Sequence, residues 1–137
     1  MQIKDILQKN KHIKFALLFG SFANDTANNL SDIDIAIYTE NKLDILEFGM
    51  LVSDLEIATE KRIDLVELKD LYKTNAKLAF NIVDSHKLIF CNDEDKYIDF
   101  KSNTMQYYFD IKPMYEMFDK QLLKRLDNGT FGQIQKP

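Results

Sequence analysis

Three aspartates have the residue type and spacing to do chemistry. Asp32 and Asp34 stand two residues apart, and Asp64 lies further along the chain. Side chains two apart on a strand project from the same face, with Cα atoms about 6.5–7 Å apart, so their oxygens can share hard cations. A third carboxylate from a neighbouring strand would complete a site for two Mg²⁺ ions about 3.5–4 Å apart, which hold the attacking and leaving oxygens in phosphoryl displacement.

A Gly-Ser pair upstream suits the phosphates of such a substrate. Gly20 lacks a Cβ, so its backbone can approach a triphosphate closely. Ser21 is the predicted N-cap of a short helix over Phe22 to Thr26, whose first N–H groups would point at the phosphates. This arrangement predicts nucleotidyl transfer from a nucleoside triphosphate, with pyrophosphate leaving and Asp64 able to accept the proton of the attacking hydroxyl.

The spacing is more informative than the aspartates alone. Fifteen Asp residues give about one or two Asp-x-Asp pairs by chance, and Asp93-Glu94-Asp95 contains one that reads as a helix start. A Gly-Ser at one fixed distance before such a pair arises by chance in roughly two of a thousand cases. The candidate catalytic and metal-binding residues are therefore Asp32, Asp34 and Asp64, and the candidate nucleotide-binding residues are Gly20 and Ser21.

Hydrophobic periodicity indicates the elements that would position these residues. Predicted strands span Lys14–Phe19, Ser31–Tyr38, Arg62–Leu68 and Lys87–Cys91. Predicted helices span the first ten residues, Leu43–Ala58, Asp70–His86 and a stretch from Asp93 to Leu126, in which Pro113 makes a kink or starts a second helix. In the second strand, Asp32 and Asp34 fall on the face opposite three isoleucines.

This order predicts an α/β (α+β) fold with a small mixed β-sheet of nucleotidyltransferase type, flanked by helices and followed by a helical C-terminal arm. Residues 1–92 would form the catalytic core. Residues 93–137 would form a C-terminal helical extension of the same domain, and their Met and aromatic side chains suit a partner-docking arm.

Composition limits the classes of binding partner and the cellular compartment that we expect. Lys and Arg number 18 against 22 Asp and Glu, a net charge of -4, so no direct DNA binding is expected. No apolar run approaches the roughly 20 residues of a membrane span. Cys91 is the single cysteine, which leaves no internal disulfide and makes a reducing cytoplasm the simplest compartment.

The spacing Gly-Ser-x10-Asp-x-Asp, followed by an aspartate in a later strand, resembles the signature of the DNA polymerase β-like nucleotidyltransferase superfamily. The short chain is similar to the minimal nucleotidyltransferases, the MntA-type antitoxins paired with HEPN-domain ribonuclease toxins. The segments that carry this likeness are Gly20–Ala23, Ser31–Ile35, Arg62–Val66 and, at the C-terminal end, Tyr107–Pro113.

The resemblance implies an antitoxin that transfers AMP from ATP, with Mg²⁺, to a tyrosine hydroxyl of a HEPN toxin with which it forms a hetero-oligomer. Asp32, Asp34 and Asp64 would hold the metal, and Gly20 and Ser21 the phosphates. In one departure, Asn24-Asp25 stands where members of the group often carry Arg-Gly. The alternatives are transfer to a small-molecule hydroxyl and an antitoxin that neutralises by binding alone, with a vestigial site.

Overall fold

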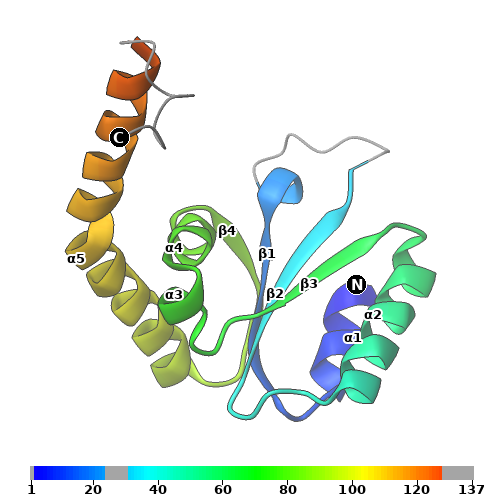
Figure 1. The fold of residues 1–137 in the computed structure, drawn as a ribbon. Helices are drawn as coiled ribbons and strands as arrows, with labels where there is room; N and C mark the ends of the chain where they lie inside the picture. Colours follow the sequence, from blue (N-terminus) through cyan, green and yellow to red (C-terminus); the bar gives the residue numbers. More distant parts are fainter. Residues whose placement is uncertain (1, 24–30, 128–137) are drawn as a thin grey trace.

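The computed structural model describes residues 2–23 and 31–127, in which helices cover both faces of one sheet (Figure 1). In chain order the described elements are α1 (Gln2–Lys9), β1 (Ile13–Phe19), the 3₁₀ turn η1 (Gly20–Phe22), β2 (Ile33–Thr39), α2 (Ile45–Thr59), β3 (Ile63–Glu67), α3 (Leu71–Thr74), α4 (Ala76–Asp84), β4 (His86–Cys91) and α5 (Glu94–Asp127). The predicted α+β class is confirmed.

The sheet is mixed, as predicted. Its strands lie in the order β3-β2-β1-β4, with β2 and β3 parallel and the other neighbours antiparallel. Figure 1 shows that β1 ends and β2 begins at the same end of the sheet, beside η1. Because β3 runs parallel to β2, it also begins there. β4 is antiparallel to β1 and begins there as well, with His86 opposite Phe19. One end of the sheet therefore collects the first residues of three strands and the turn after the fourth.

Each face of the sheet has its own core. Leu7, Ile35 and Leu55 belong to the core under α1 and α2. Phe15 and Phe100 belong to the core on the opposite face, under α4 and α5. The predicted alternation of β2 is confirmed, and both of its faces are buried along most of the strand. The aspartate face of β2 is thus a continuation of the second core, ending at the open end of the sheet.

The helix predicted over Asp70–His86 is two helices, and this prediction is wrong at Asn75 and at its end. Asn75 has φ -148° and ψ 76°, outside the helical region, and its side-chain oxygen accepts a hydrogen bond from the Leu78 backbone at 3.2 Å. An Asn side chain that satisfies the backbone in this way favours a cap over a helix interior. At the other end, His86 pairs with Phe19 and begins β4.

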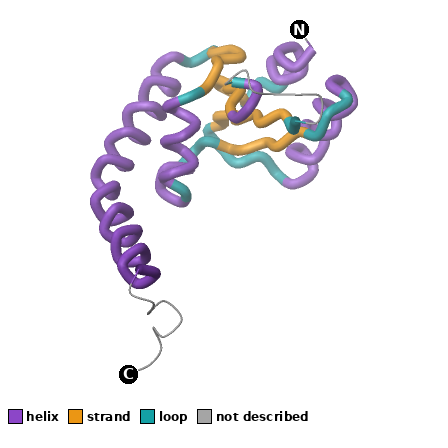
Figure 2. The backbone as a smooth tube through the Cα atoms, turned by 90° about the horizontal axis from the view of Figure 1, so that it is seen from above, coloured by secondary structure: helices purple, strands orange, loops and turns teal. Residues whose placement is uncertain are grey.

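The C-terminal stretch is one helix, so the alternative that Pro113 starts a second helix is wrong. Proline removes one backbone donor, but Pro113 is exposed, where water can hydrate the carbonyl that loses its partner. Figure 2 shows α5 curving along its length. No helix within the described ranges is long and apolar enough to cross a bilayer.

Candidate active site

The structure brings Asp34 and Asp64 together as a register pair on adjacent parallel strands. They lie on the same face, because Ile33, Ile35, Ile63 and Leu65 all point into the core on the other side. The two carboxylates thus stand side by side at the end of the sheet where β2 and β3 begin. Asp64 joins Asp34 from a neighbouring strand, which is the position that the sequence predicts for a third carboxylate.

Gly20 lies directly against Asp34. Its φ is +71°, and a Cβ built on it would come within 2.1 Å of Oδ2 of Asp34. The sequence predicts that the missing Cβ lets a triphosphate approach, whereas the structure shows that the Asp34 carboxylate uses this space. A left-handed backbone and a carboxylate in van der Waals contact both require glycine at this position. Gly20 therefore sets where Asp34 can stand.

Ser21 is not the N-cap that the sequence predicts. The 3₁₀ turn begins one residue earlier, Phe19 occupies the cap position without a side-chain hydrogen bond, and Ser21 lies within the turn. The physical reason is the positive φ of Gly20, which turns the chain as soon as β1 ends. The rest of the helix predicted over Phe22 to Thr26, and the Asn24-Asp25 pair, lie outside the described residues.

Asp32 lies just before β2 and is exposed. The backbone N–H of the next residue, Ile33, donates to the Arg62 carbonyl at 2.9 Å, so the parallel ladder already begins at this position. Strand alternation then puts Asp32 on the face of Asp34. The three aspartates occur at one end of the sheet, but across residues 2–23 and 31–121 no three or more acidic, His or Cys side chains gather closely enough to hold a metal ion.

The electrostatics of Asp34 reflect this crowding. Burial is the largest cause that raises the pKa of Asp34, followed by the charges of Asp64 and Asp32 and by a hydrogen bond that the protonated Asp34 carboxyl donates to Asp64. Carboxylates that repel one another are suited to binding a cation, which removes the repulsion. The oxygen donors fit Mg²⁺, which is commonly held by one or two carboxylates together with substrate phosphates.

Phe19 is part of the surroundings of Asp34, and the predicted site residues do not include it. It is the register partner of Asp34 on the other neighbouring strand, β1. Asp34 thus stands between a carboxylate on β3 and an aromatic residue on β1, and apolar neighbours raise the cost of ionising a carboxylate. The alternation of Phe15, Leu17 and Phe19 along β1 was the signal that could have identified it.

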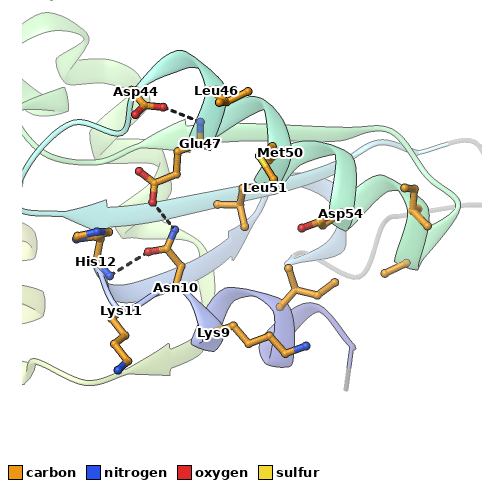
Figure 3. Close-up of a pocket in the computed structure, with 13 residues that line it drawn as sticks. Lys9, Asn10, Lys11, His12, Asp44, Leu46, Glu47, Met50, Leu51 and Asp54 are labelled. Atoms are coloured by element: carbon orange, nitrogen blue, oxygen red, sulfur yellow. Dashed lines mark hydrogen bonds between the residues drawn. The ribbon is translucent and has the colours of Figure 1, made fainter.

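A separate groove of about 820 Å³ lies between α1 and α2, on the other side of the sheet (Figure 3). Asn10 donates to Glu47 across it at 3.2 Å. Its lining includes exposed apolar residues of α2, such as Leu46 and Met50, and none of the five predicted site residues. The carboxylates therefore lie outside this groove.

A family model described as polymerase beta, nucleotidyltransferase matches residues 1–95. The chain belongs to this nucleotidyltransferase family. The match spans all four strands and the carboxylate pair, and it ends as α5 begins. The nucleotidyltransferase core is therefore the part of the chain that positions Gly20, Asp34 and Asp64.

Solved structures share the fold of this nucleotidyltransferase over most of its length. A chain from a crystal structure of a toxin-antitoxin with AMP-PNP is 24% identical, with TM-score 0.76 over 89% of this chain and 96% of that one. A chain from the MntA-HepT toxin-antitoxin has 23% identity and TM-score 0.68, over 88% and 93% of the two chains. A chain from a complex of a tri-AMPylated Shewanella oneidensis HEPN toxin with an MNT antitoxin has 22% identity and TM-score 0.69, over 90% and 99%. A search among curated proteins gave no match.

Proposed function

We propose that this nucleotidyltransferase is an antitoxin that transfers AMP from ATP, with Mg²⁺, to a tyrosine hydroxyl of a HEPN ribonuclease toxin. The observation that carries the proposal is the register pair of Asp34 and Asp64 beside Gly20. The similar structures add support, because the likeness extends into α5, beyond the part that the family model matches.

The proposed reaction is a displacement at the α-phosphorus of ATP. The tyrosine oxygen forms a bond to that phosphorus, the bond from the phosphorus to the oxygen that bridges to the β-phosphate breaks, and pyrophosphate leaves. Asp64 is exposed and can accept the hydroxyl proton. Asp32, Asp34 and Asp64 would hold Mg²⁺, which when bound would stabilise the charge on the phosphoryl oxygens. Gly20 and Ser21 would line the phosphates.

We assign the docking of the toxin to the distal part of α5, residues 109–121. Phe80 of α4 stacks on Tyr108 at 4.1 Å between ring centroids, and beyond this contact the helix exposes large apolar side chains. The exposed members are Phe109, Met114, Tyr115, Met117 and Phe118. Figure 1 shows this part of α5 extending past the end of the sheet at which η1 lies. A toxin held there would be close to the carboxylates.

The test is transfer to a HEPN-domain toxin. The purified toxin is incubated with the antitoxin, ATP and Mg²⁺, and the mass of its tyrosine peptides is measured. We expect the added mass of one or more AMP groups. Asp34→Asn should reduce the rate on the order of 10²–10³-fold, the usual loss when one charge-stabilising group leaves a preorganised site. Asp54→Asn is the matched control, since Asp54 is exposed on α2, away from the site.

The same experiment separates the two alternatives. If the complex forms and no adduct appears, and if Asp34→Asn still rescues cells from the toxin, binding alone neutralises and the transfer proposal is wrong. If the chain adds a nucleotide to a small-molecule hydroxyl and leaves the toxin unmodified, the acceptor class is wrong. An adduct that depends on Asp34, with rescue lost in the variant while the complex still forms, supports transfer.

A further inference from the structure

We propose that Arg62 binds the phosphates of the nucleoside triphosphate beyond the α-phosphate, those that leave as pyrophosphate. This inference rests on the proposed function, since it assigns a further residue to the same site. The sequence leaves Lys61 and Arg62 as two equivalent cations beside the third aspartate. The structure separates them and gives only one of them a place on the carboxylate face.

The first step is the position of the Arg62 backbone. Its carbonyl accepts the hydrogen bond from Ile33, and Ile33 is the register partner of Ile63. Arg62 is therefore next to Asp32 across the ladder, two positions before the pair of Asp34 and Asp64. Since Ile63 points into the α1–α2 core, alternation places the Arg62 side chain on the opposite face, with Asp64.

The second step is that the segment before β3 is held rigidly. Glu60 ends α2 in the left-handed conformation, with φ 55°, and its N–H donates to the Glu56 carbonyl at 2.8 Å. The Thr59 hydroxyl donates to the Leu55 carbonyl at 2.8 Å, and Glu56 Oε2 accepts from the Ile63 N–H at 3.2 Å. The Arg62 side chain thus starts from a fixed backbone position.

The third step is the contrast with Lys61. Its ammonium lies 5.8 Å from the centroid of the Phe22 ring, and Phe22 packs against the α1–α2 core. Lys61 is therefore engaged on the far side of the ladder from Asp34 and Asp64. Arg62 is exposed, and among residues 2–23 and 31–121 its guanidinium has no carboxylate within ion-pair distance.

The chemistry follows from charge and distance. The carboxylates and the triphosphate are both negative, so phosphates that extend past the metal-binding pair need a cation of the protein. A residue spaced two along a strand lies about 6.5–7 Å away, so Arg62 meets the part of the nucleotide next to the reacting phosphorus. The reacting α-phosphorus is linked to the β- and γ-phosphates on one side and to an uncharged nucleoside on the other. A guanidinium binds phosphate oxygens in bidentate fashion, so Arg62 should contact the β- and γ-phosphates and not the nucleoside.

The test is direct binding of ATP and of AMP by calorimetry in Mg²⁺ buffer. Arg62→Met should weaken ATP binding about 10- to 100-fold, the effect expected when hydrogen bonds to a charged group are lost. It should leave AMP binding unchanged, because AMP lacks the leaving phosphates. Lys61→Met is the matched control and should bind ATP like the natural chain. Arg62→Lys should restore part of the ATP affinity.

Three results overturn the inference. They are equal ATP affinity of Arg62→Met and the natural chain, equal losses in Arg62→Met and Lys61→Met, and equal loss of ATP and AMP binding in Arg62→Met. Arg62→Gln provides a second variant, and the unfolding transition of each variant confirms that it is folded. If the natural chain binds no ATP, the proposed function itself fails, whereas normal ATP binding that is insensitive to Arg62 refutes only this inference.

Discussion

The carboxylate end of the sheet and the distal part of α5 are built in opposite ways. At the carboxylate end, each position is set by contacts within the chain: Gly20 limits Asp34, and Asp34 pairs with Asp64. In the distal part of α5, large apolar side chains face outward, and Phe118 is 68% exposed. Packing within the chain fixes the first region, whereas in the second Met114, Met117 and Phe118 keep 61–69% of their surface exposed.

Under the proposed function, this difference assigns catalysis to the carboxylate end of the sheet and recognition of the acceptor protein to the distal part of α5. The proposed function requires catalytic groups that are held in place before substrate arrives, and parallel strands hold Asp34 and Asp64 in register without help from another molecule. Recognition can be completed later, because exposed Met and aromatic residues adapt to the surface that covers them. We therefore expect changes in the two regions to have different consequences for stability, binding and transfer.

The largest contrast should lie within α5 itself. Phe100 is 3% exposed in the core under α4 and α5, so Phe100→Ala should lower the free energy of unfolding by about 3–5 kcal/mol. Phe118→Ala should change it by no more than about 0.5 kcal/mol, and should weaken toxin binding instead. Denaturant unfolding and pull-down of the toxin measure the two effects. A large loss of stability in Phe118→Ala would contradict the comparison.

The next contrast uses two glycines. Gly20→Ala places a Cβ against the Asp34 carboxylate at a positive φ, so it should cost about 1–3 kcal/mol and reduce transfer by displacing Asp34 from Asp64. Gly49 lies inside α2 with nothing within 4 Å of its would-be Cβ, and Gly49→Ala should stabilise the fold by about 0.5–1 kcal/mol. Thermal unfolding and a transfer assay of both variants test whether the signs differ.

The smallest effect is the pH dependence of Asp34. Because its pKa is raised in the folded state, the protonated form is favoured by folding, and this stability is lost as the pH rises from the ordinary pKa of 3.8 through the raised value. Without metal, Asp34→Asn should therefore unfold at a higher temperature than the natural chain at pH 7, and the difference should vanish below pH 3.8.

Mg²⁺ provides the control for this prediction. If the carboxylates hold the ion, Mg²⁺ should raise the unfolding temperature of the natural chain at pH 7 and have less effect on Asp34→Asn. Asp54→Asn, with its exposed side chain, should behave like the natural chain in both measurements. A natural chain that is more stable than Asp34→Asn at pH 7 without metal would show that Asp34 ionisation is not unfavourable.

Much of the fold follows from local patterns. The four strands occur where alternation and short apolar runs predict them, because side chains on alternate faces must match two cores. The predictions that are wrong concern the start, end or continuity of a helix, which single residues decide. Asn75 divides a predicted helix, Pro113 is accommodated within one helix, and Gly20 begins the turn that Ser21 was expected to cap.

The sequence by itself determined which residues are candidates for the site, since residue type and spacing single out Gly20, Ser21, Asp32, Asp34 and Asp64. Only the tertiary structure decided which of them meet: the parallel pairing of β2 with β3 sets Asp34 beside Asp64, and the antiparallel pairing of β1 with β2 brings Gly20 against Asp34. The physical reason is that the spacing along one strand is local, whereas the register between strands depends on burying both faces of the whole sheet.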